Sequence, residues 1–376
     1  MPVDFDKLRA SFPVVNQLAY FNHAAVAPLP VQAAEAINAY LKDVSTFGAI
    51  HENRWLKEIE VVRERYARLI NADPGEIAFL KSTSAGVQLV AQGVDFKAGG
   101  KVVTADVEFP ANVYPWMALA PRGIEVKFVG AREGRVEPQD VERAIDAKTR
   151  VVALSLVEFG NGFRNHVEEV GEVCRRKGVH FFLDAIQGVG AIPFDVKAFN
   201  IDFVAVGAHK WLLGPQGVGI FFCRKEIIDR LRFEDVSWRS VVDEDDFTNY
   251  RMNLKPDARR FEGDQPNFMG ILGLGGSLAL REEIGNPVIF ARVRALADRL
   301  IDGLAERGYA IRSPMHKDER SGIVSFGHAR FESKEIYQTL RRAGIVVATR
   351  NGLVRASPHF YNTDDEIDRL LAELPQ

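Results

Sequence analysis

Cysteine is scarce in this chain, and neither sign of charge is in marked excess. The 376 residues include only two cysteines, Cys174 and Cys223. Two cysteines cannot supply the disulfide framework of a small secreted protein, so a reducing cytoplasm is the expected location. The formal net charge is −3. Because no basic run stands out, no nucleic-acid partner is expected.

Long apolar runs are also missing. No uninterrupted apolar stretch approaches the roughly 18 residues of a membrane span, so no membrane partner is expected. Asp4 and Asp6 lie where a signal peptide would have its apolar core. What is present, 47% hydrophobic and 26% charged residues, is typical of a globular protein. A chain of this length can form one large domain and a smaller one.

The middle of the chain alternates between apolar strands and helical segments. Seven strands are expected, at residues 77–80, 102–104, 124–129, 151–156, 181–183, 203–206 and 219–222. Apolar strands that alternate with helices indicate an α/β fold with a mostly parallel sheet covered on both faces. The last strand is expected to be antiparallel, because residues 210–218 are too few for a helical crossover.

The flanking segments are mainly helical. Apolar residues recur at helical spacing over 31–70, and a second helical stretch, 267–304, is broken at Gly285-Asn286-Pro287. Beyond this break, strands and helices mix as in a small α+β domain. The predicted division is a large α/β domain over 16–285 and a small domain over 286–376, on which residues 1–15 pack.

Two neighbouring strands end in residues of complementary chemistry. The strand 179–183 is followed by Asp184, and the strand 203–206 by His209 and Lys210. Parallel strands place such ends on one rim of the sheet. Pyridoxal 5'-phosphate (PLP) needs an amine for its Schiff base and an anion that keeps its pyridine nitrogen protonated. The Asp184–Lys210 pair therefore predicts a PLP site with Lys210 as the catalytic residue.

The two strand-end segments, DAIQ at 184–187 and GAHKWLLGPQGVG at 207–219, also carry a family resemblance. The chain resembles the class V aminotransferases, which are fold-type I PLP enzymes. This family includes cysteine desulfurases, kynureninase-like lyases and isopenicillin N epimerase-like proteins. The resemblance runs from about Tyr20 to the C-terminus. It implies a homodimer with active sites at the interface, an amino-acid substrate and no metal.

The resemblance assigns residues to the cofactor phosphate. Ser84 and Ala85, at a strand-to-helix turn, would bind it through a helix N-terminus. His209 would join them, whereas Gly207 stands where many relatives carry a hydroxyl group. Gln265 lies in the stretch that reaches the phosphate of the partner subunit in this family.

Three further residues are assigned to the pyridine ring. Asp184 would lie under its nitrogen, and Gln187 would donate to its hydroxyl group. Phe109 would stack on its face, where cysteine desulfurases have a histidine. A phenyl ring can stack but cannot transfer a proton.

Substrate contacts are expected from both ends of the chain. Arg355 would pair with the substrate α-carboxylate, because a guanidinium binds a carboxylate through two parallel hydrogen bonds. Asn22 and His23 form the N-terminal lip of the site in this family. The roles of Trp238 and Arg239 stay open.

The remaining question is the reaction. No cysteine follows Cys223, and Asn351-Gly352 indicates a tight hairpin where a desulfurase would need a long loop with a thiolate. The protein is therefore not expected to be a persulfide-forming cysteine desulfurase. The family resemblance favours an aminotransferase, with a kynureninase-like or C–S lyase or an isopenicillin N epimerase-like epimerase as alternatives. A non-catalytic protein on the same fold is the remaining alternative.

Overall fold

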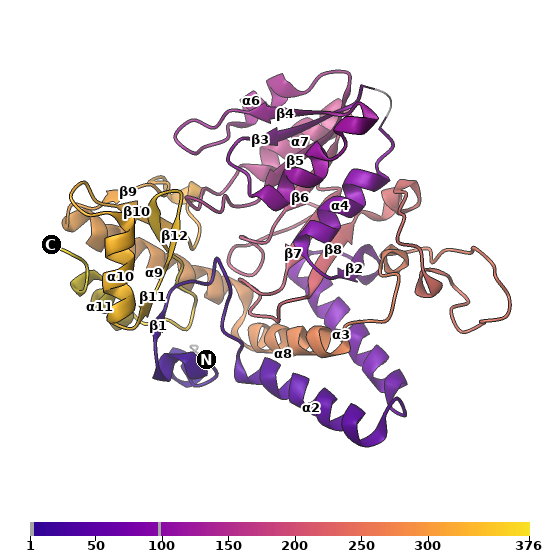
Figure 1. The fold of residues 1–376 in the computed structure, drawn as a ribbon, viewed down its shortest axis with the longest axis horizontal. Coiled ribbons are helices and arrows are strands. Elements are labelled where there is room, and N and C mark those ends of the chain that lie inside the picture. Colours follow the sequence, from indigo (N-terminus) through magenta and orange to yellow (C-terminus); the bar gives the residue numbers. More distant parts are fainter. Residues whose placement is uncertain (1–3, 97–98) are drawn as a thin grey trace.

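The computed structural model describes residues 4–96 and 99–376. Its centre is a seven-stranded sheet of order β2-β8-β7-β6-β5-β3-β4 (Figure 1). The strands are β2 (Ile77–Leu80), β3 (Lys101–Ala105), β4 (Glu125–Val129), β5 (Thr149–Ser155), β6 (His180–Asp184), β7 (Phe203–Gly207) and β8 (Gly219–Cys223). β4, β3, β5, β6 and β7 are parallel, and β8 is antiparallel to both of its neighbours. The mostly parallel sheet and its antiparallel last strand are confirmed.

Both faces of this sheet are buried. In β5, Val151 and Ala153 join one hydrophobic cluster, and Val152 and Leu154 join the other. The covering helices include α4 (Thr83–Gly93), α5 (Tyr114–Met117), α6 (Pro138–Ala144) and α7 (Val167–Lys177). Burial on both faces explains why the strands are apolar throughout rather than alternating.

Three long helices form the base of the large domain in Figure 1. They are α2 (Val31–Phe47), α3 (Glu52–Ile70) and α8 (Phe268–Ile284). The predicted helical stretch 31–70 is thus two helices, with Gly48 in a positive-φ conformation (58°) at the break. A Cβ on Gly276 of α8 would lie 2.4 Å from the carbonyl oxygen of Gln32, so the close approach of α2 and α8 needs a glycine there.

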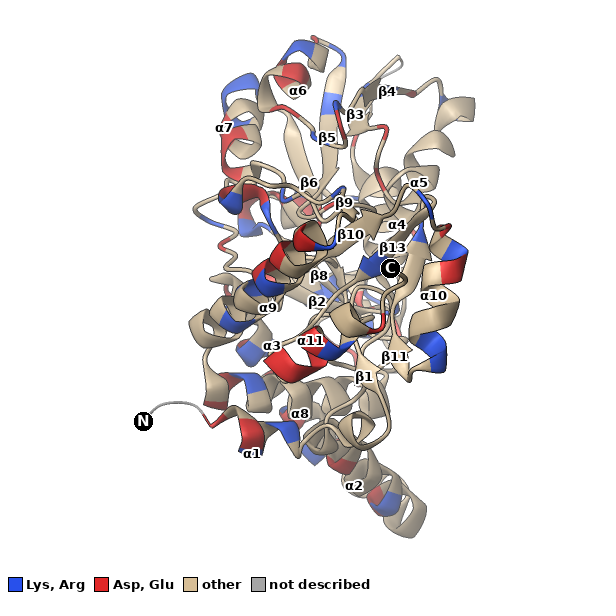
Figure 2. Ribbon diagram, turned by 90° about the vertical axis from the view of Figure 1, so that its left-hand side faces the viewer, with Lys and Arg blue, Asp and Glu red and all other residues tan. Residues whose placement is uncertain are grey.

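The C-terminal part forms a smaller α+β layer beside the large sheet (Figures 1 and 2). It comprises α9 (Asn286–Glu306), β9 (Ala310–Ile311), β10 (Val324–Gly327), α10 (Ser333–Arg342), β11 (Ile345–Val346), β12 (Ala348–Arg350), β13 (Leu353–Ala356) and α11 (Asp364–Ala372). Four of its strands form an antiparallel sheet, β12-β13-β10-β9. Asn351 and Gly352, with φ of 51° and 76°, form the predicted tight hairpin between β12 and β13.

The N-terminal segment packs against this smaller layer. After α1 (Phe5–Arg9), β1 (Ala19–Tyr20) pairs in parallel with β11. Ala19 and Phe21 belong to the hydrophobic cluster of the C-terminal part. The hydrophobic cluster of the C-terminal part therefore includes residues up to 21, and the expected boundary at 15 stays a prediction. The division at 285 and 286 stays a prediction, and residues 1–3 of the expected N-terminal segment lie outside the described residues.

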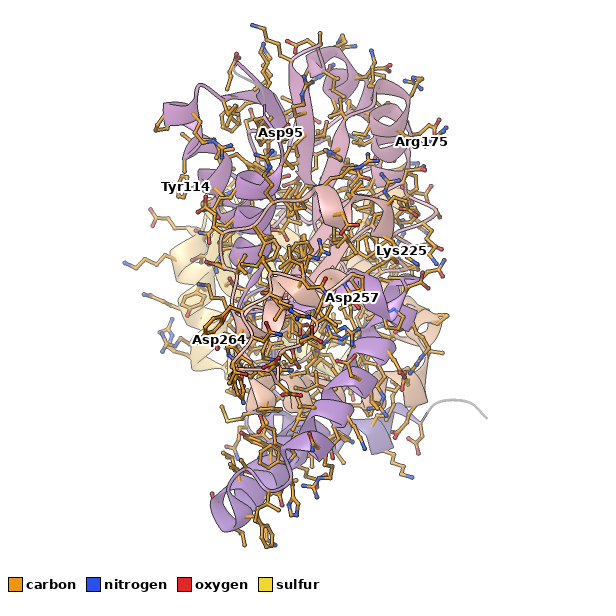
Figure 3. All side chains as sticks on the ribbon, turned by 90° about the vertical axis from the view of Figure 1, so that its right-hand side faces the viewer. Asp95, Tyr114, Arg175, Lys225, Asp257 and Asp264 are labelled. Carbon is orange, nitrogen blue, oxygen red and sulfur yellow. The ribbon has the colours of Figure 1, made fainter. Side chains whose placement is uncertain are left out.

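Short 3-10 helices complete the chain: η1 (Pro13–Asn16), η2 (Pro74–Glu76), η3 (Pro110–Asn112), η4 (Ala120–Arg122), η5 (Lys225–Arg230), η6 (Trp238–Ser240), η7 (Ala258–Phe261) and η8 (Lys317–Glu319). The segment before η7 loops away from the sheet in Figure 1, and Figure 3 labels Asp257 and Asp264, which flank η7 in the sequence. Across residues 4–96 and 99–376, no helix combines the length and the apolar character that crossing a bilayer requires.

Candidate active site

Asp184 and Lys210 lie on the same rim of the parallel sheet, as predicted. Asp184 is the last residue of β6 and pairs in register with Ala205 of β7. β7 ends at Gly207, and Lys210 follows three residues later. Each of the two side chains influences the pKa of the other. The sheet thus brings the predicted amine and carboxylate into one electrostatic environment.

The Lys210 side chain is partly buried and weakly basic for a lysine. Burial lowers its pKa to about 8. Asp184 acts in the opposite direction, whereas the cationic Arg355 and Arg350 lower the pKa further. A lowered pKa leaves more of the amine neutral near pH 7, which is the form that attacks a carbonyl carbon.

Asp184 is a buried carboxyl group, and few hydrogen bonds offset the cost of burying its charge. One oxygen accepts a hydrogen bond of 3.0 Å from the backbone amide of Ile186. Burial raises the pKa of Asp184 to about 6, and Lys210 opposes this shift. A cation placed against Asp184 would offset the cost of its burial, and a pyridinium nitrogen fits that requirement.

Phe109 presents its ring to the same space. It is 43% exposed in spite of its apolar side chain. The ring centroid lies 5.8 Å from Nζ of Lys210 and 5.1 Å from the ring of Phe159, which it meets edge-on. An exposed aromatic face next to the lysine suits a stacked heteroaromatic ring.

The predicted phosphate site lies at the start of α4. Ser82 caps the helix by accepting from the amide of Ala85 at 3.2 Å, and Ser84 lies in the first turn. The hydroxyl oxygen of Thr83 is buried and has no hydrogen-bond partner within the described residues. A helix N-terminus with an unpaired hydroxyl group has the donors that a phosphate needs.

Gly207 and His209 lie next to Lys210. A Cβ on Gly207 would lie 3.0 Å from Cε1 of His209 and 2.9 Å from Cδ1 of Ile186. A side chain at 207 would therefore require His209 to move. Burial lowers the pKa of His209 to about 4, so the imidazole is neutral at pH 7.

Both ends of the Gln187 amide are engaged within the chain. Nε2 donates to the carbonyl of Ala24 at 2.9 Å, and Oε1 accepts from Nε1 of Trp211 at 3.0 Å. The predicted bond from Gln187 to the ring hydroxyl stays a prediction. It would have to use the second hydrogen of Nε2.

Arg355 is a buried cation with an open hydrogen-bond donor. One terminal nitrogen donates to the carbonyl of Phe159 at 2.7 Å, whereas Nε has no partner within the described residues. Among the described residues, 4–96 and 99–376, no carboxylate forms an ion pair with Arg355. Burial, and then Arg350, lower its pKa to about 10. A substrate carboxylate would supply the missing anion.

Asn22 and His23 lie beside Ser357, two residues after Arg355. The side-chain oxygen of Asn22 is buried and has no partner in the described structure. Both ring nitrogens of His23 are engaged, with the carbonyl of Ser357 and the hydroxyl of Tyr361, each at 2.8 Å. Burial lowers the pKa of His23 to about 4. Asn22 thus keeps free capacity for a ligand, whereas His23 is held by the protein.

The Gln265 segment lies close to the phosphate region. Gln265 and Ala85 line one cavity of about 570 Å³. The Gln265 amide donates to Glu52 at 2.7 Å. Arg239 stacks on Trp238, with 5.3 Å from the guanidinium carbon to the ring centroid, and pairs with Glu244.

Several charged residues of this region were not predicted from the sequence. Glu108 and Glu158 are buried carboxyl groups whose pKa values respond to Asp184. Arg350 lowers the pKa values of both Lys210 and Arg355. One signal was available for Glu158, because an acidic residue directly follows the apolar pair Leu156-Val157.

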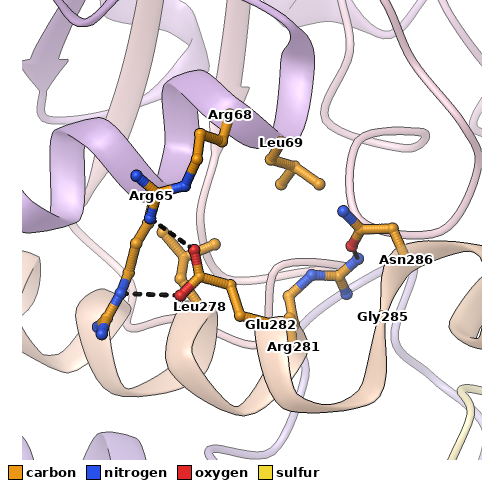
Figure 4. Close-up of a pocket in the computed structure, with 8 residues that line it drawn as sticks. All are labelled: Arg65, Arg68, Leu69, Leu278, Arg281, Glu282, Gly285 and Asn286. Carbon is orange, nitrogen blue, oxygen red and sulfur yellow. Dashed lines mark hydrogen bonds and ion pairs between the residues drawn. The ribbon is translucent and has the colours of Figure 1, made fainter.

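A second cavity, of about 260 Å³, lies between α3 and α8 and contains none of the predicted site residues (Figure 4). Glu282 there pairs with Arg65 and Arg68. The buried Arg281 donates to Asn286 and, through a long bond of 3.4 Å, to the carbonyl of Trp211. The residues that line this cavity come from α3, α8 and the start of α9, and Lys210 is not among them.

Comparisons with known proteins agree with this geometry. The sequence model of the family "Aminotransferase class-V" matches residues 19–370. A protein of Pyrococcus abyssi named "Probable cysteine desulfurase" is 30% identical over 392 residues, which is 99% of this chain and 97% of that protein. The apo structure of a cysteine desulfurase from Thermococcus onnurineus has a TM-score of 0.90 and 28% identity, covering 98% of this chain and 96% of that one. A cystine C–S lyase in complex with cysteine persulfide has a TM-score of 0.87 and 25% identity, covering 96% and 98%.

These matches confirm the predicted family, the fold-type I architecture and PLP as the cofactor. The buried Asp184, the weakly basic Lys210 and the exposed face of Phe109 fit this cofactor. The individual residue roles stay predictions.

The predicted exclusion of cysteine desulfurase activity is wrong, because relatives and structural neighbours over nearly the whole chain carry that name. The observations behind the exclusion are correct: the hairpin is tight, and Cys174 and Cys223 are both buried. The error lay in inferring a missing activity from a missing loop thiol. Breaking a carbon–sulfur bond depends on the cofactor site, and the sulfur acceptor is a separate question.

Proposed function

The chain belongs to the class V aminotransferase family, and we propose that it is a PLP-dependent enzyme that breaks the carbon–sulfur bond of cysteine or its disulfide. The observation that carries the enzymatic part is the placement of Lys210 and Asp184 at one rim of the large sheet, which Arg355 of β13 reaches through its bond to the Phe159 carbonyl. The sulfur chemistry is supported by relatives named cysteine desulfurases and by a neighbour described as a cystine C–S lyase.

Each residue of the grouping has a distinct task in this proposal. Lys210 holds PLP covalently and, once released, moves a proton at the substrate Cα. Asp184 keeps the pyridine nitrogen protonated, and Phe109 covers the ring. Bound PLP supplies an electron sink for the bond that breaks at the substrate.

Arg355 selects and orients the substrate. Its unpaired Nε would complete a two-point contact with the α-carboxylate of an amino acid. Anchoring the carboxylate fixes the direction of the bonds at Cα relative to the cofactor ring, which is how binding energy is used for orientation. Asn22, with its unpaired amide oxygen, is suited to bind the substrate amino group.

The active form is proposed to be a cytoplasmic homodimer. Support comes from the resemblance, in which the Gln265 segment reaches the cofactor phosphate of the partner subunit, and from the cavity that Gln265 and Ala85 line together. A reducing compartment is consistent with two cysteines that are both free and buried.

The test is an assay of the PLP-loaded protein with L-cysteine and L-cystine, and with L-serine as the matched substrate that has oxygen in place of sulfur. We expect sulfide from L-cysteine and cysteine persulfide from L-cystine, each with pyruvate and ammonium in equal amount. Formation of alanine from L-cysteine would instead require transfer of the sulfur to an added thiol, which would become a persulfide. A Lys210→Ala variant, the control for background chemistry of free PLP, should release none. Turnover of sulfur-free amino acids alone would contradict the proposal, and a keto acid formed without sulfur loss would indicate transamination.

A further inference from the structure

Three carboxyl groups meet beneath the proposed cofactor site. Glu108 follows β3, Glu158 follows β5, and Asp184 ends β6, so all three lie at the carboxyl ends of adjacent strands. Each is almost entirely buried, at 7%, 1% and 2% exposure respectively. Lys210 offsets part of the cost at Asp184, but three buried carboxylates beside one amine would still be costly, so at least one must carry a proton.

The hydrogen bonds decide which carboxyl group is ionised. Glu108 accepts from the amide and the hydroxyl of Ser155, each at 2.6 Å, and from the Asn112 amide at 2.9 Å. Burial raises the pKa of Glu108 to about 7, and these three donors oppose that shift because they stabilise the anion. Glu158 has a single donor, the Asn165 amide at 2.7 Å to Oε1. Its Oε2 is buried and unpartnered within the described residues.

The charged groups that act on Glu158 are acidic. Burial raises its pKa well above the usual value, and the next contributions come from Glu108, then Asp184 and Asp106. The Asn165 hydrogen bond lowers the pKa; its effect is smaller than those of burial and Glu108 but larger than that of either Asp184 or Asp106. Glu158 is therefore the carboxyl group that keeps its proton at neutral pH, and the proton belongs on the unpartnered Oε2.

Glu158 also lies next to residues of the proposed site. The following residue, Phe159, meets the ring of Phe109 and accepts the hydrogen bond of Arg355 through its carbonyl. Gln187, which was predicted to donate to the ring hydroxyl, already uses both ends of its amide on Ala24 and Trp211. One amide hydrogen of Gln187 therefore remains for the ring oxygen of PLP, which can accept a second hydrogen bond, and Glu158 has a free donor.

We infer that Glu158 stays protonated and donates through Oε2 to the ring oxygen of PLP. This inference rests on the proposed attachment of PLP at Lys210 but not on the proposed sulfur chemistry. A neutral acid at this position supplies a hydrogen bond without adding a third negative charge beside Asp184 and Glu108.

The first test is a pH titration of the visible absorbance of the PLP-loaded protein. Glu158→Gln keeps a neutral donor of similar shape, so its absorbance pKa should stay within about 0.3 units of the parent value. Glu158→Ala removes the donor that stabilises negative charge on the ring oxygen, so its absorbance pKa should rise by about one unit. An alanine variant that titrates like the parent, or a glutamine variant that shifts as far as alanine, would overturn the inference.

The second test uses cofactor-free protein and needs no activity. A carboxyl group with a raised folded-state pKa makes the folded protein bind more protons than the unfolded chain above about pH 4.3. Its contribution to stability therefore falls as the pH rises from about 5 to 8. Glu158→Gln should flatten this fall in urea unfolding. Glu76→Gln, a buried glutamate hydrogen-bonded by the backbone amides of Asp73 and Lys225, should retain it.

The two tests separate the possible failures. A parent protein without a visible cofactor band would refute attachment at Lys210, and with it the hydrogen bond to PLP. An unchanged pH slope in Glu158→Gln would show that Glu158 is ionised in the folded protein, which would overturn the inference whatever the substrate is. Absence of sulfur release would refute the proposed reaction and leave both tests of Glu158 intact.

Discussion

Arg355 of β13 donates a 2.7 Å hydrogen bond to the carbonyl of Phe159, which lies in the loop after β5. This bond joins the smaller C-terminal layer to the rim of the large sheet. It uses one terminal nitrogen and leaves Nε unpartnered among the described residues. The guanidinium is therefore held in place by the protein while part of its hydrogen-bonding capacity stays free for a substrate.

Replacing Arg355 with lysine should weaken the binding of amino-acid substrates while leaving PLP loading intact. An ammonium group cannot keep the Phe159 bond and also bind a carboxylate through two parallel bonds. Loss of such a charge-assisted contact costs about 2–5 kcal/mol. Steady-state kinetics would show this loss in kcat/KM, and absorbance would report PLP content.

The matched control for this change is Arg299→Lys. Arg299 is partly exposed and pairs with Asp368 on the surface of the C-terminal part, so this variant should behave like the parent. If Arg355→Lys processed amino acids as well as the parent, or failed to load PLP, Arg355 would not be the carboxylate anchor.

Asp184→Asn should abolish the electrostatic partner of the pyridine nitrogen and preserve the shape of the side chain. We expect turnover to fall by about 10²–10³-fold, the usual effect of losing one preorganised electrostatic group. Circular dichroism should show an intact fold, since the Ile186 amide can still bond to the amide oxygen. Unchanged turnover would mean that another residue holds the pyridinium. Asp368→Asn provides a surface control.

The sheet, and the position of Asp184 and Lys210 at its rim, could be predicted from the sequence because the signals are local. Each strand is an apolar run; Asp184 comes directly after one run, and Lys210 follows another after a few residues. Asn351-Gly352 determines its own hairpin through positive φ angles. None of these features depends on a partner distant in sequence.

The groups that were not predicted depend on distant partners. In the sequence, Glu158 is distinguished only as an acidic residue after an apolar strand. Its protonation state depends on Glu108 and Asp184, which lie at the ends of other strands. The hydrogen bonds of Gln187 connect it to Ala24, 163 positions away in the chain, and to Trp211, 24 positions away. Similarly, the pairing of β1 with β11 carries the N-terminal segment into the small-domain core, and two short strands give no periodic signal for it.

Phe109 is predicted to act by stacking alone. Phe109→Leu should reduce PLP affinity, because an aliphatic side chain loses the aromatic contact, which is worth about 0.5–1.5 kcal/mol beyond area burial. Phe109→Tyr should retain most of the affinity. Neither change should displace the pH–rate profile, since a phenyl ring carries no proton to transfer. A displaced pH profile with unchanged affinity would contradict stacking as its role.

The environment of Lys210 predicts how the cofactor-free protein responds to pH. The folded-state pKa of Lys210 is lowered to about 8 from the ordinary 10.5. Between these values the unfolded chain binds more protons than the folded protein, so the contribution of Lys210 to stability rises with pH, by at most about 1.4 kcal/mol per unit. Lys210→Met should therefore be more stable than the parent near pH 8, and the difference should shrink towards pH 10. Urea unfolding at several pH values measures it, with the exposed Lys225→Met as the control. A constant difference across this range would show that burial does not weaken the Lys210 amine, and its suitability for holding PLP would then need another explanation.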